Sequence, residues 1–155
     1  MRLYSDAFTD QTTIPVKYAM PGAGGQNISI PYRWEGVPQG TQSLALSLID
    51  PHPVANNWIH WLVLNIPASI TSLPEGASGN SMPEGSLELT NSFGRIGYGG
   101  PQPPAGSGEH PYVATLYALD AASVALAQTA TLQQFAETVD SLVLAQATYT
   151  GFFER

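Results

Sequence analysis

Glycine and proline interrupt this chain so often that long regular elements have little room to form. The 155 residues include 15 glycines and 13 prolines, scattered without a collagen-like repeat. Prolines interrupt helices and central strands, and glycines favour turns, so short elements joined by turns are expected. Hydrophobic residues make up 43% of the chain, which is enough for one packed core of ordinary domain size. We therefore expect a single domain over residues 1–155.

Most segments between the turns have the composition and alternation of β-strands. Residues 58–66 alternate in a period of two, with even-numbered positions expected on one face and odd-numbered positions on the other. Residues 43–49 are nearly all apolar, which is typical of a strand buried on both faces. The pattern favours an antiparallel sandwich or barrel. Further strands are expected at 14–19, 28–34, 112–119 and 142–153.

Only one segment carries a clear helical signal. Thr131 and Gln134 have the spacing of a capping box, in which two side chains satisfy free N–H groups at the start of a helix. Apolar residues then recur at helical spacing as far as Val139. We expect one short helix near the C-terminus, over about 132–140.

The charge balance excludes two classes of partner. Twelve acidic residues outnumber five basic ones, a net charge of −7, and the basic residues form no cluster. Nucleic-acid binding and adsorption to anionic membranes both depend on a basic patch. We therefore expect no nucleic-acid partner, and an anionic ligand would need a local pocket that works against the overall field.

The chain contains no cysteine, which excludes disulfides, thiolate catalysis and thiolate metal sites. Its first ten residues lack an apolar signal region, and no run of 18 apolar residues occurs. The expectation is a cytoplasmic protein with no stable membrane insertion.

Three histidines and one aspartate are the residues best suited to binding or catalysis. Asp50 stands where an apolar strand gives way to a proline-broken loop that also carries His52, and such strand ends often hold binding groups. His60 lies within a strand rich in aromatic residues, and if buried it needs a hydrogen-bond partner. Two interpretations of His60 are open at this point, a core histidine and a ligand residue.

The third histidine, His110, follows a glycine- and proline-rich segment, residues 99–109. Such a loop either holds a ligand against its backbone or forms a rigid turn, and it lacks the sequence of a nucleotide phosphate loop. A metal site built from the histidines and Asp50 is chemically feasible, but its spacing matches no known motif, so we expect no metal and no other cofactor. No Gly-x-Ser-x-Gly sequence marks a nucleophilic serine.

Taken together, these segments resemble the phosphatidylethanolamine-binding protein family, also called the Raf kinase inhibitor protein family. The resemblance is to its small bacterial and archaeal branch, and it extends over almost the whole chain in family order and spacing. The matching segments are SDAF (5–8), NISIPYRW (27–34), GVP and TQSLAL (36–46), DP (50–51), HWLVLNIP (60–67), NSFG and GYGGPQPP (91–104), GEHPY (108–112) and GFFER (151–155).

The resemblance implies a mainly β fold, a β-sandwich of two antiparallel sheets with Greek-key connections. It also implies a small pocket at one end that binds small anions and phospholipid head groups. The ligand contacts would come from Asp50, His60, His110 and Tyr112. We add His52 at the rim, and the walls implied by the resemblance are Pro51, Gly100, Pro101 and Pro103.

The chain departs from the family pattern at four places. His52 replaces the second aspartate of the first signature, and Pro53-Val54 replaces the usual Ala-Pro after it. Pro111 replaces an arginine between His110 and Tyr112, and Gln102 stands where many bacterial members have cysteine. The rim therefore loses one negative and one positive charge, so the ligand preference need not follow that of the family.

Three functions are open on this basis. The first is a small-ligand binding protein for anionic or phosphate-bearing head groups, with regulation among its uses. The second is a kinase or protease inhibitor acting through protein contact, although no segment specifies a partner. The third is an enzyme that uses the Asp/His pocket for acid–base chemistry on a small substrate. Low charge and three tryptophans permit a homodimer without requiring one.

Overall fold

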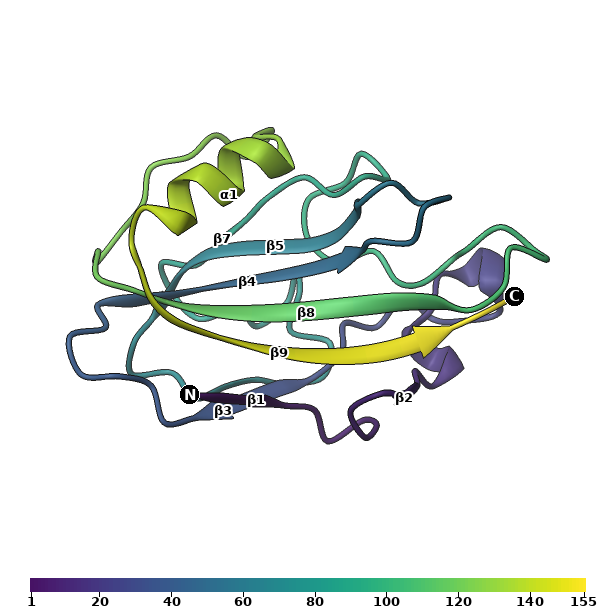
Figure 1. Cartoon of the computed structure of the whole chain (residues 1–155), viewed down its shortest axis with the longest axis horizontal. Coiled ribbons are helices and arrows are strands. Elements are labelled where there is room, and N and C mark those ends of the chain that lie inside the picture. Colours follow the sequence, from purple (N-terminus) through teal and green to yellow (C-terminus); the bar gives the residue numbers. More distant parts are fainter.

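The computed structural model describes all 155 residues and has the mainly β architecture that the sequence predicts (Figure 1). The strand expected at 28–34 is confirmed only in its second half, as β3. The elements are β1 Arg2–Tyr4, β2 Thr12–Thr13, two 3-10 helices at Val16–Tyr18 and Pro21–Ala23, β3 Tyr32–Glu35, β4 Ser43–Asp50, β5 Trp58–Pro67, β6 Ser72–Leu73, β7 Leu87–Glu88, β8 His110–Leu119, α1 Leu132–Asp140 and β9 Val143–Phe153.

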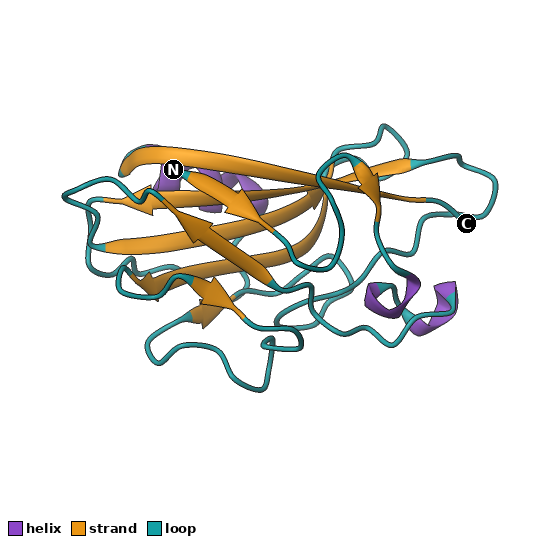
Figure 2. Cartoon of the chain, turned by 90° about the horizontal axis from the view of Figure 1, so that it is seen from below, coloured by secondary structure: helices purple, strands orange, loops and turns teal.

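The strands form two sheets that pack face to face, with α1 against the outer side of the larger sheet. The larger sheet has the strand order β2-β9-β8-β4-β5-β7, and the smaller has the order β1-β3-β6. After the hairpin of β4 and β5, the chain makes a long connection and returns as β8 to pair with β4, which is a Greek-key connection. Figure 2 shows the small sheet in front of the large one, with α1 on the far side.

Successive residues of the large sheet contribute to two separate apolar clusters. Leu44 and Leu48 of β4 face the small sheet and belong to the main core of 22 buried residues. Ala45 faces the opposite way and joins Phe135 and Val139 of α1 in a second cluster of 9 buried residues. Strand β4 is therefore buried on both faces, as its apolar sequence predicts.

The one α-helix lies where the sequence predicts it, and the capping box is confirmed. The Gln134 N–H donates to the Thr131 hydroxyl at 3.2 Å, and the Thr131 N–H donates to the Gln134 side-chain oxygen at 2.9 Å. These two bonds satisfy N–H groups that the first helical turn leaves free. No helix in the structure is long and apolar enough to cross a membrane.

The strand expected at 14–19 is wrong. Pro15 instead leads into the first 3-10 helix, whose turn is closed by the Tyr18 N–H donating to the Pro15 carbonyl at 3.1 Å. The apolar residues that suggested a strand, Ile14 and Tyr18, are buried in the main core all the same. Only Ile14 makes a backbone hydrogen bond to a strand, its N–H donating to the Phe152 carbonyl at 2.8 Å, so burial is the main origin of the apolar pattern here.

Strand β5 departs from strict alternation at two β-bulges. At the first bulge, Leu48 pairs with Trp61 and Ile49 pairs with Ile59, which leaves His60 as an extra residue with no partner opposite it. Ile59 consequently packs toward α1, while Trp61 is fully buried between the sheets. The expectation that residues 59 and 61 share a face is wrong for this reason.

The second bulge lies near Asn65, whose φ of 59° is in the left-handed region. It reverses the alternation again, because Leu62 and Leu64 pack toward α1 while Ile66 joins the core between the sheets. The expectation that all even-numbered residues from 58 to 66 share one face is therefore wrong. Leu62 and Leu64 pack toward α1, whereas Trp58 and His60 line the cavity and Ile66 lies in the core between the sheets.

Candidate functional site

The candidate site lies at one end of the space between the sheets, where inward-facing positions change from apolar to polar. Asp50 ends β4, and His110 and Tyr112 begin the neighbouring strand β8. The first bulge of β5 brings His60 to the same end. None of the four residues is more than 3% exposed, so each polar group must find a partner inside the protein or in a ligand.

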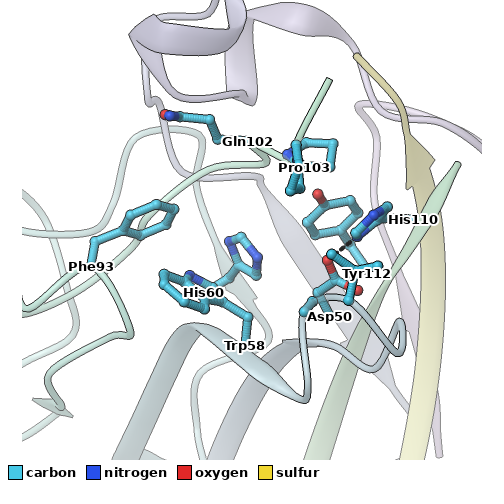
Figure 3. A pocket seen from close by; sticks show the side chains of 11 residues that line it. Asp50, Trp58, His60, Phe93, Gln102, Pro103, His110 and Tyr112 are labelled. Atoms are coloured by element: carbon cyan, nitrogen blue, oxygen red, sulfur yellow. Dashed lines mark hydrogen bonds and ion pairs between the residues drawn. The ribbon is translucent and has the colours of Figure 1, made fainter. Parts of the chain in front are cut away.

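A cavity of about 320 Å³ opens between these four residues and two loops (Figure 3). Its size is that of a small-molecule site, and no lysine or arginine lines it. The remaining lining residues are mostly apolar or aromatic: Val54, Ala55, Trp58, Phe93, Gln102, Pro103 and Pro104.

His60 is held in one orientation and kept neutral. Its Nδ1 lies 2.6 Å from the Gly99 carbonyl oxygen, and since a carbonyl only accepts, Nδ1 carries the proton. Burial lowers the pKa of His60 to about 4, although the Gly99 carbonyl and the nearby Asp50 carboxyl favour the charged form. The imidazole therefore has no charge at neutral pH, and its Nε2 has no partner in the protein.

Asp50 and His110, which line the cavity, form a hydrogen-bonded chain with Ser107. The His110 Nδ1 lies 2.6 Å from Asp50 Oδ2, and the His110 Nε2 lies 2.9 Å from the Ser107 hydroxyl oxygen. The Ser107 hydroxyl also donates to the Pro104 carbonyl at 2.6 Å. The hydrogen bond between Asp50 and His110 is almost completely buried.

His52 lies behind this chain instead of in the cavity. Its ring stacks on the His110 ring, with the two centroids 3.8 Å apart, and its backbone N–H donates to Asp50 Oδ1 at 2.8 Å. The Val54 N–H donates to the His52 Nδ1 at 3.2 Å. His52 therefore fixes the positions of Asp50 and His110.

The Tyr112 hydroxyl is the unexplained polar group of the site. It is buried and has no hydrogen-bond partner. Burial raises the pKa of Tyr112, with the Asp50 carboxyl adding to the shift, so the hydroxyl keeps its proton and stays a donor. The Tyr112 ring meets the His60 ring edge to face, with centroids 4.9 Å apart.

The glycine- and proline-rich loop is fastened to the segment around the 3-10 helices. The Gly100 N–H donates to the Asn27 side-chain oxygen at 2.7 Å, and the Pro101 carbonyl accepts the Met20 N–H at 3.0 Å. A Cβ on Gly100 would lie 2.0 Å from the Tyr18 carbonyl oxygen, so only glycine permits this close approach. These contacts hold the loop that carries the far wall of the cavity.

A second, larger crevice of about 510 Å³ lies between β1 and β9. Its polar side chains, including Arg2, Asp10 and Gln146, are exposed to solvent. No buried polar group there lacks a partner, so nothing in that crevice requires a ligand.

Comparison with known proteins identifies the family. Residues 4–154 match the sequence model of a family described as "Phosphatidylethanolamine-binding protein". The chain belongs to this family. It is 38% identical to a UPF0098 protein of Methanothermobacter thermautotrophicus, covering 100% of this chain and 99% of the relative, and 35% identical to YbhB of Escherichia coli K12, covering 99% of each. The crystal structure of Escherichia coli YbcL, described as a new member of the mammalian PEBP family, superposes with a TM-score of 0.93 at 30% identity, over 99% of this chain and 98% of YbcL.

In this member of the phosphatidylethanolamine-binding protein family, the predicted ligand residues separate into two groups. Pro51 is exposed, His52 stacks behind His110, and Gly100 and Pro101 fasten the loop, so these four do not line the cavity. The other five line it together: Asp50, His60, Pro103, His110 and Tyr112.

Sequence reasoning missed several lining residues of this family member. Trp58 was assigned to the face of His60, which was a signal that it could reach the site, and Phe93 lies within the matching segment 91–94. Ser107 carried no signal, because its contact with His110 depends on the path of the loop.

Proposed function

We propose that this protein binds a small molecule through an oxyanion head group, above all a phosphate-bearing one, held in the cavity between His60 and Tyr112. The Tyr112 hydroxyl is the observation that supports the proposal, because it is a buried donor at a cavity with no acceptor in the protein. Leaving such a group unpaired is costly, and a ligand oxygen would supply the missing acceptor.

The other walls of the cavity suit the organic part of such a molecule. The Trp58 and Phe93 rings meet edge to face, with centroids 5.3 Å apart, and Val54 and the prolines extend this apolar surface. Both oxygens of Asp50 already take part in hydrogen bonds, one with the backbone N–H of His52 and the other with the His110 ring. Asp50 therefore orients His110, and the head group would bind mainly through Tyr112 and His60.

The proposal is tested by a titration of the protein with phosphoethanolamine and with inorganic phosphate, followed by NMR. We expect the resonances of His60, Tyr112 and the loop 99–104 to move together along one binding curve. Residues of the larger crevice, such as Tyr4 and Gln146, are the internal control and should not move. The proposal is wrong if neither compound shifts the cavity resonances at tens of millimolar, a concentration that detects very weak binding.

A hydrolase is the second candidate, because Ser107, His110 and Asp50 are connected as in a serine triad. In that role the Ser107 proton would pass to His110 as the Ser107 oxygen attacks an ester carbonyl, the alcohol would leave with that proton, and water would then release the acid. The resting arrangement differs, because Ser107 donates to Pro104 instead of to His110. A fluorophosphonate probe tests the candidate: labelling that Ser107→Ala abolishes would support it, and no labelling would refute it.

We also propose a cytoplasmic location and a function that involves no nucleic acid, both on sequence grounds alone. The net charge of −7 without a basic cluster supports the second point. A homodimer is a prediction that sedimentation at micromolar concentration would check, and no observed surface identifies a kinase or protease partner.

A further inference from the structure

We propose that the cavity selects head groups that still carry a proton, namely phosphate monoesters and free phosphate in the monoanionic form, because His60 presents a hydrogen-bond acceptor to the ligand. This rests on the proposed function and narrows it. Intact phospholipids are phosphodiesters and have no such proton near neutral pH, so the proposal favours monoesters over the head groups that the family name suggests.

The argument begins with the two nitrogen atoms of His60. The Gly99 carbonyl occupies Nδ1 at 2.6 Å, and a carbonyl oxygen can only accept. A neutral imidazole has one N–H, so Nε2 is left with a lone pair and no proton. The ring lies between Phe93 and Tyr112 and lines the cavity (Figure 3). The ligand therefore meets an acceptor at this position.

The surroundings keep His60 in this neutral form. The titratable groups that face it are Asp50 from β4 and His110 and Tyr112 from β8. Asp50 and His110 are hydrogen-bonded to each other, and Tyr112 keeps its proton because burial raises its pKa. Burial then outweighs the attraction of Asp50, and with a pKa of about 4 the His60 ring stays uncharged above pH 5.

The Tyr112 hydroxyl and the His60 Nε2 thus offer one donor and one acceptor to the same cavity. A phosphate monoester monoanion matches both, because its bare oxygens accept from Tyr112 and its P–O–H donates to His60. A fully deprotonated oxyanion would place a lone pair against the lone pair of Nε2, which leaves a buried acceptor unpaired. No lysine or arginine lines the cavity to offset that loss.

The experiment compares phosphoethanolamine with 2-aminoethyl sulfate by calorimetry on the wild-type protein. At pH 5.5 the two compounds have nearly the same size and charge and differ by one proton, since a sulfate ester is a strong acid. We expect phosphoethanolamine to bind about tenfold more tightly or better. Its affinity should fall above about pH 6, where a phosphate monoester loses its second proton. The sulfate ester should bind weakly at every pH.

Titrations with two further compounds show whether the head group comes from free phosphate or from an intact lipid. Inorganic phosphate should show the same fall in affinity, displaced to the higher pH at which its own monoanion loses its second proton. Glycerophosphoethanolamine, a diester with the head group of a phospholipid, should bind as weakly as the sulfate ester. Diester binding equal to that of the monoester would assign the site to intact lipid head groups and overturn the proposal.

Two protein variants and one spectroscopic signature complete the test. Long-range proton–nitrogen NMR should show His60 as the neutral Nδ1–H tautomer from pH 5 to 8. His60→Gln should lose the preference for phosphate over sulfate, whereas Tyr98→Phe, a change in the core outside the cavity, should keep it. If phosphate and sulfate esters bind the wild type equally, proton selection is wrong but the oxyanion site stands. If neither binds, both proposals fail.

Discussion

The core between the sheets and the cavity end occupy the same inward faces of β4, β5 and β8. In the core, Leu48 pairs with Trp61, and the indole N–H of Trp61 donates to the Glu88 carboxylate at 2.7 Å. At the cavity end, Tyr112 has a hydroxyl with no partner and His60 has a free nitrogen. Polar groups are thus satisfied within the protein in one region and left available in the other, which is the pattern expected where a stable scaffold carries a site.

The largest expected effect lies on the core side of this comparison. Trp61→Ala should lower the free energy of unfolding by roughly 3–5 kcal/mol, because it opens a cavity among fully buried side chains and leaves Glu88 without one donor. Chemical denaturation measures the loss. Below the unfolding transition, phosphoethanolamine affinity should be nearly unchanged, since Trp61 does not line the cavity. A large loss of affinity in the folded variant would mean that the two regions are not separable.

The next effect comes from the pH dependence of stability at the cavity end. The pKa of His60 is about 4 in the folded chain, against an ordinary value of 6.5. Between these two values, His60 binds a proton in the unfolded chain but stays neutral in the folded chain. Stability should therefore fall as the pH falls from about 6.5 to 4, by up to roughly 3 kcal/mol, and change no further through this group below pH 4. Denaturation curves across this range measure the slope.

Two variants, His60→Gln and His52→Gln, show whether His60 causes this loss of stability in acid. His60→Gln should remove the His60 component of the acid loss, and His52→Gln should retain it. If the wild type and His60→Gln lose stability in parallel between pH 6.5 and 4, His60 does not titrate as a buried neutral histidine, and the contrast between the two regions is weaker than the structure indicates.

Much of this architecture could be predicted from the sequence, because local signals and the family resemblance agreed. The capping box at Thr131 and Gln134 fixed the start of α1, and the apolar run at 43–49 predicted a doubly buried strand. The strand expected at 14–19 failed because buried apolar residues give the same pattern in a 3-10 turn as in a strand. Apolar character predicts burial more directly than it predicts backbone conformation.

The details of the site could not be predicted, since they depend on non-local geometry. The bulge that brings His60 into the cavity depends on pairing with β4, and no single residue of β5 predicts it. The proton position on His60 follows from a carbonyl 39 residues away, and the contact of Ser107 with His110 follows from the path of the loop. Residue types were therefore predictable where hydrogen-bonding roles were not.

The smallest expected effect is the sharpest comparison of the two regions, because it removes one hydroxyl from each. Tyr112→Phe keeps the ring and its edge contact with His60, and deletes a donor that has no partner in the protein. Its unfolding free energy should stay the same or rise by about 1 kcal/mol, since an unpaired buried group is lost. Phosphoethanolamine affinity should fall about tenfold, because the head group loses a hydrogen bond.

The control is Tyr98→Phe in the core. Tyr98 donates to the Tyr18 carbonyl at 2.9 Å and lies outside the cavity. Its loss should cost about 1 kcal/mol of stability, because a buried carbonyl loses its donor, and ligand affinity should not change. The two variants are expected to have opposite effects on stability and on ligand affinity, because the protein supplies a partner for the Tyr98 hydroxyl and none for the Tyr112 hydroxyl. Denaturation curves and ligand titrations on both variants measure these effects. If Tyr112→Phe instead destabilises the fold as Tyr98→Phe does and binds phosphoethanolamine normally, then the Tyr112 hydroxyl has a structural partner and no role in ligand binding.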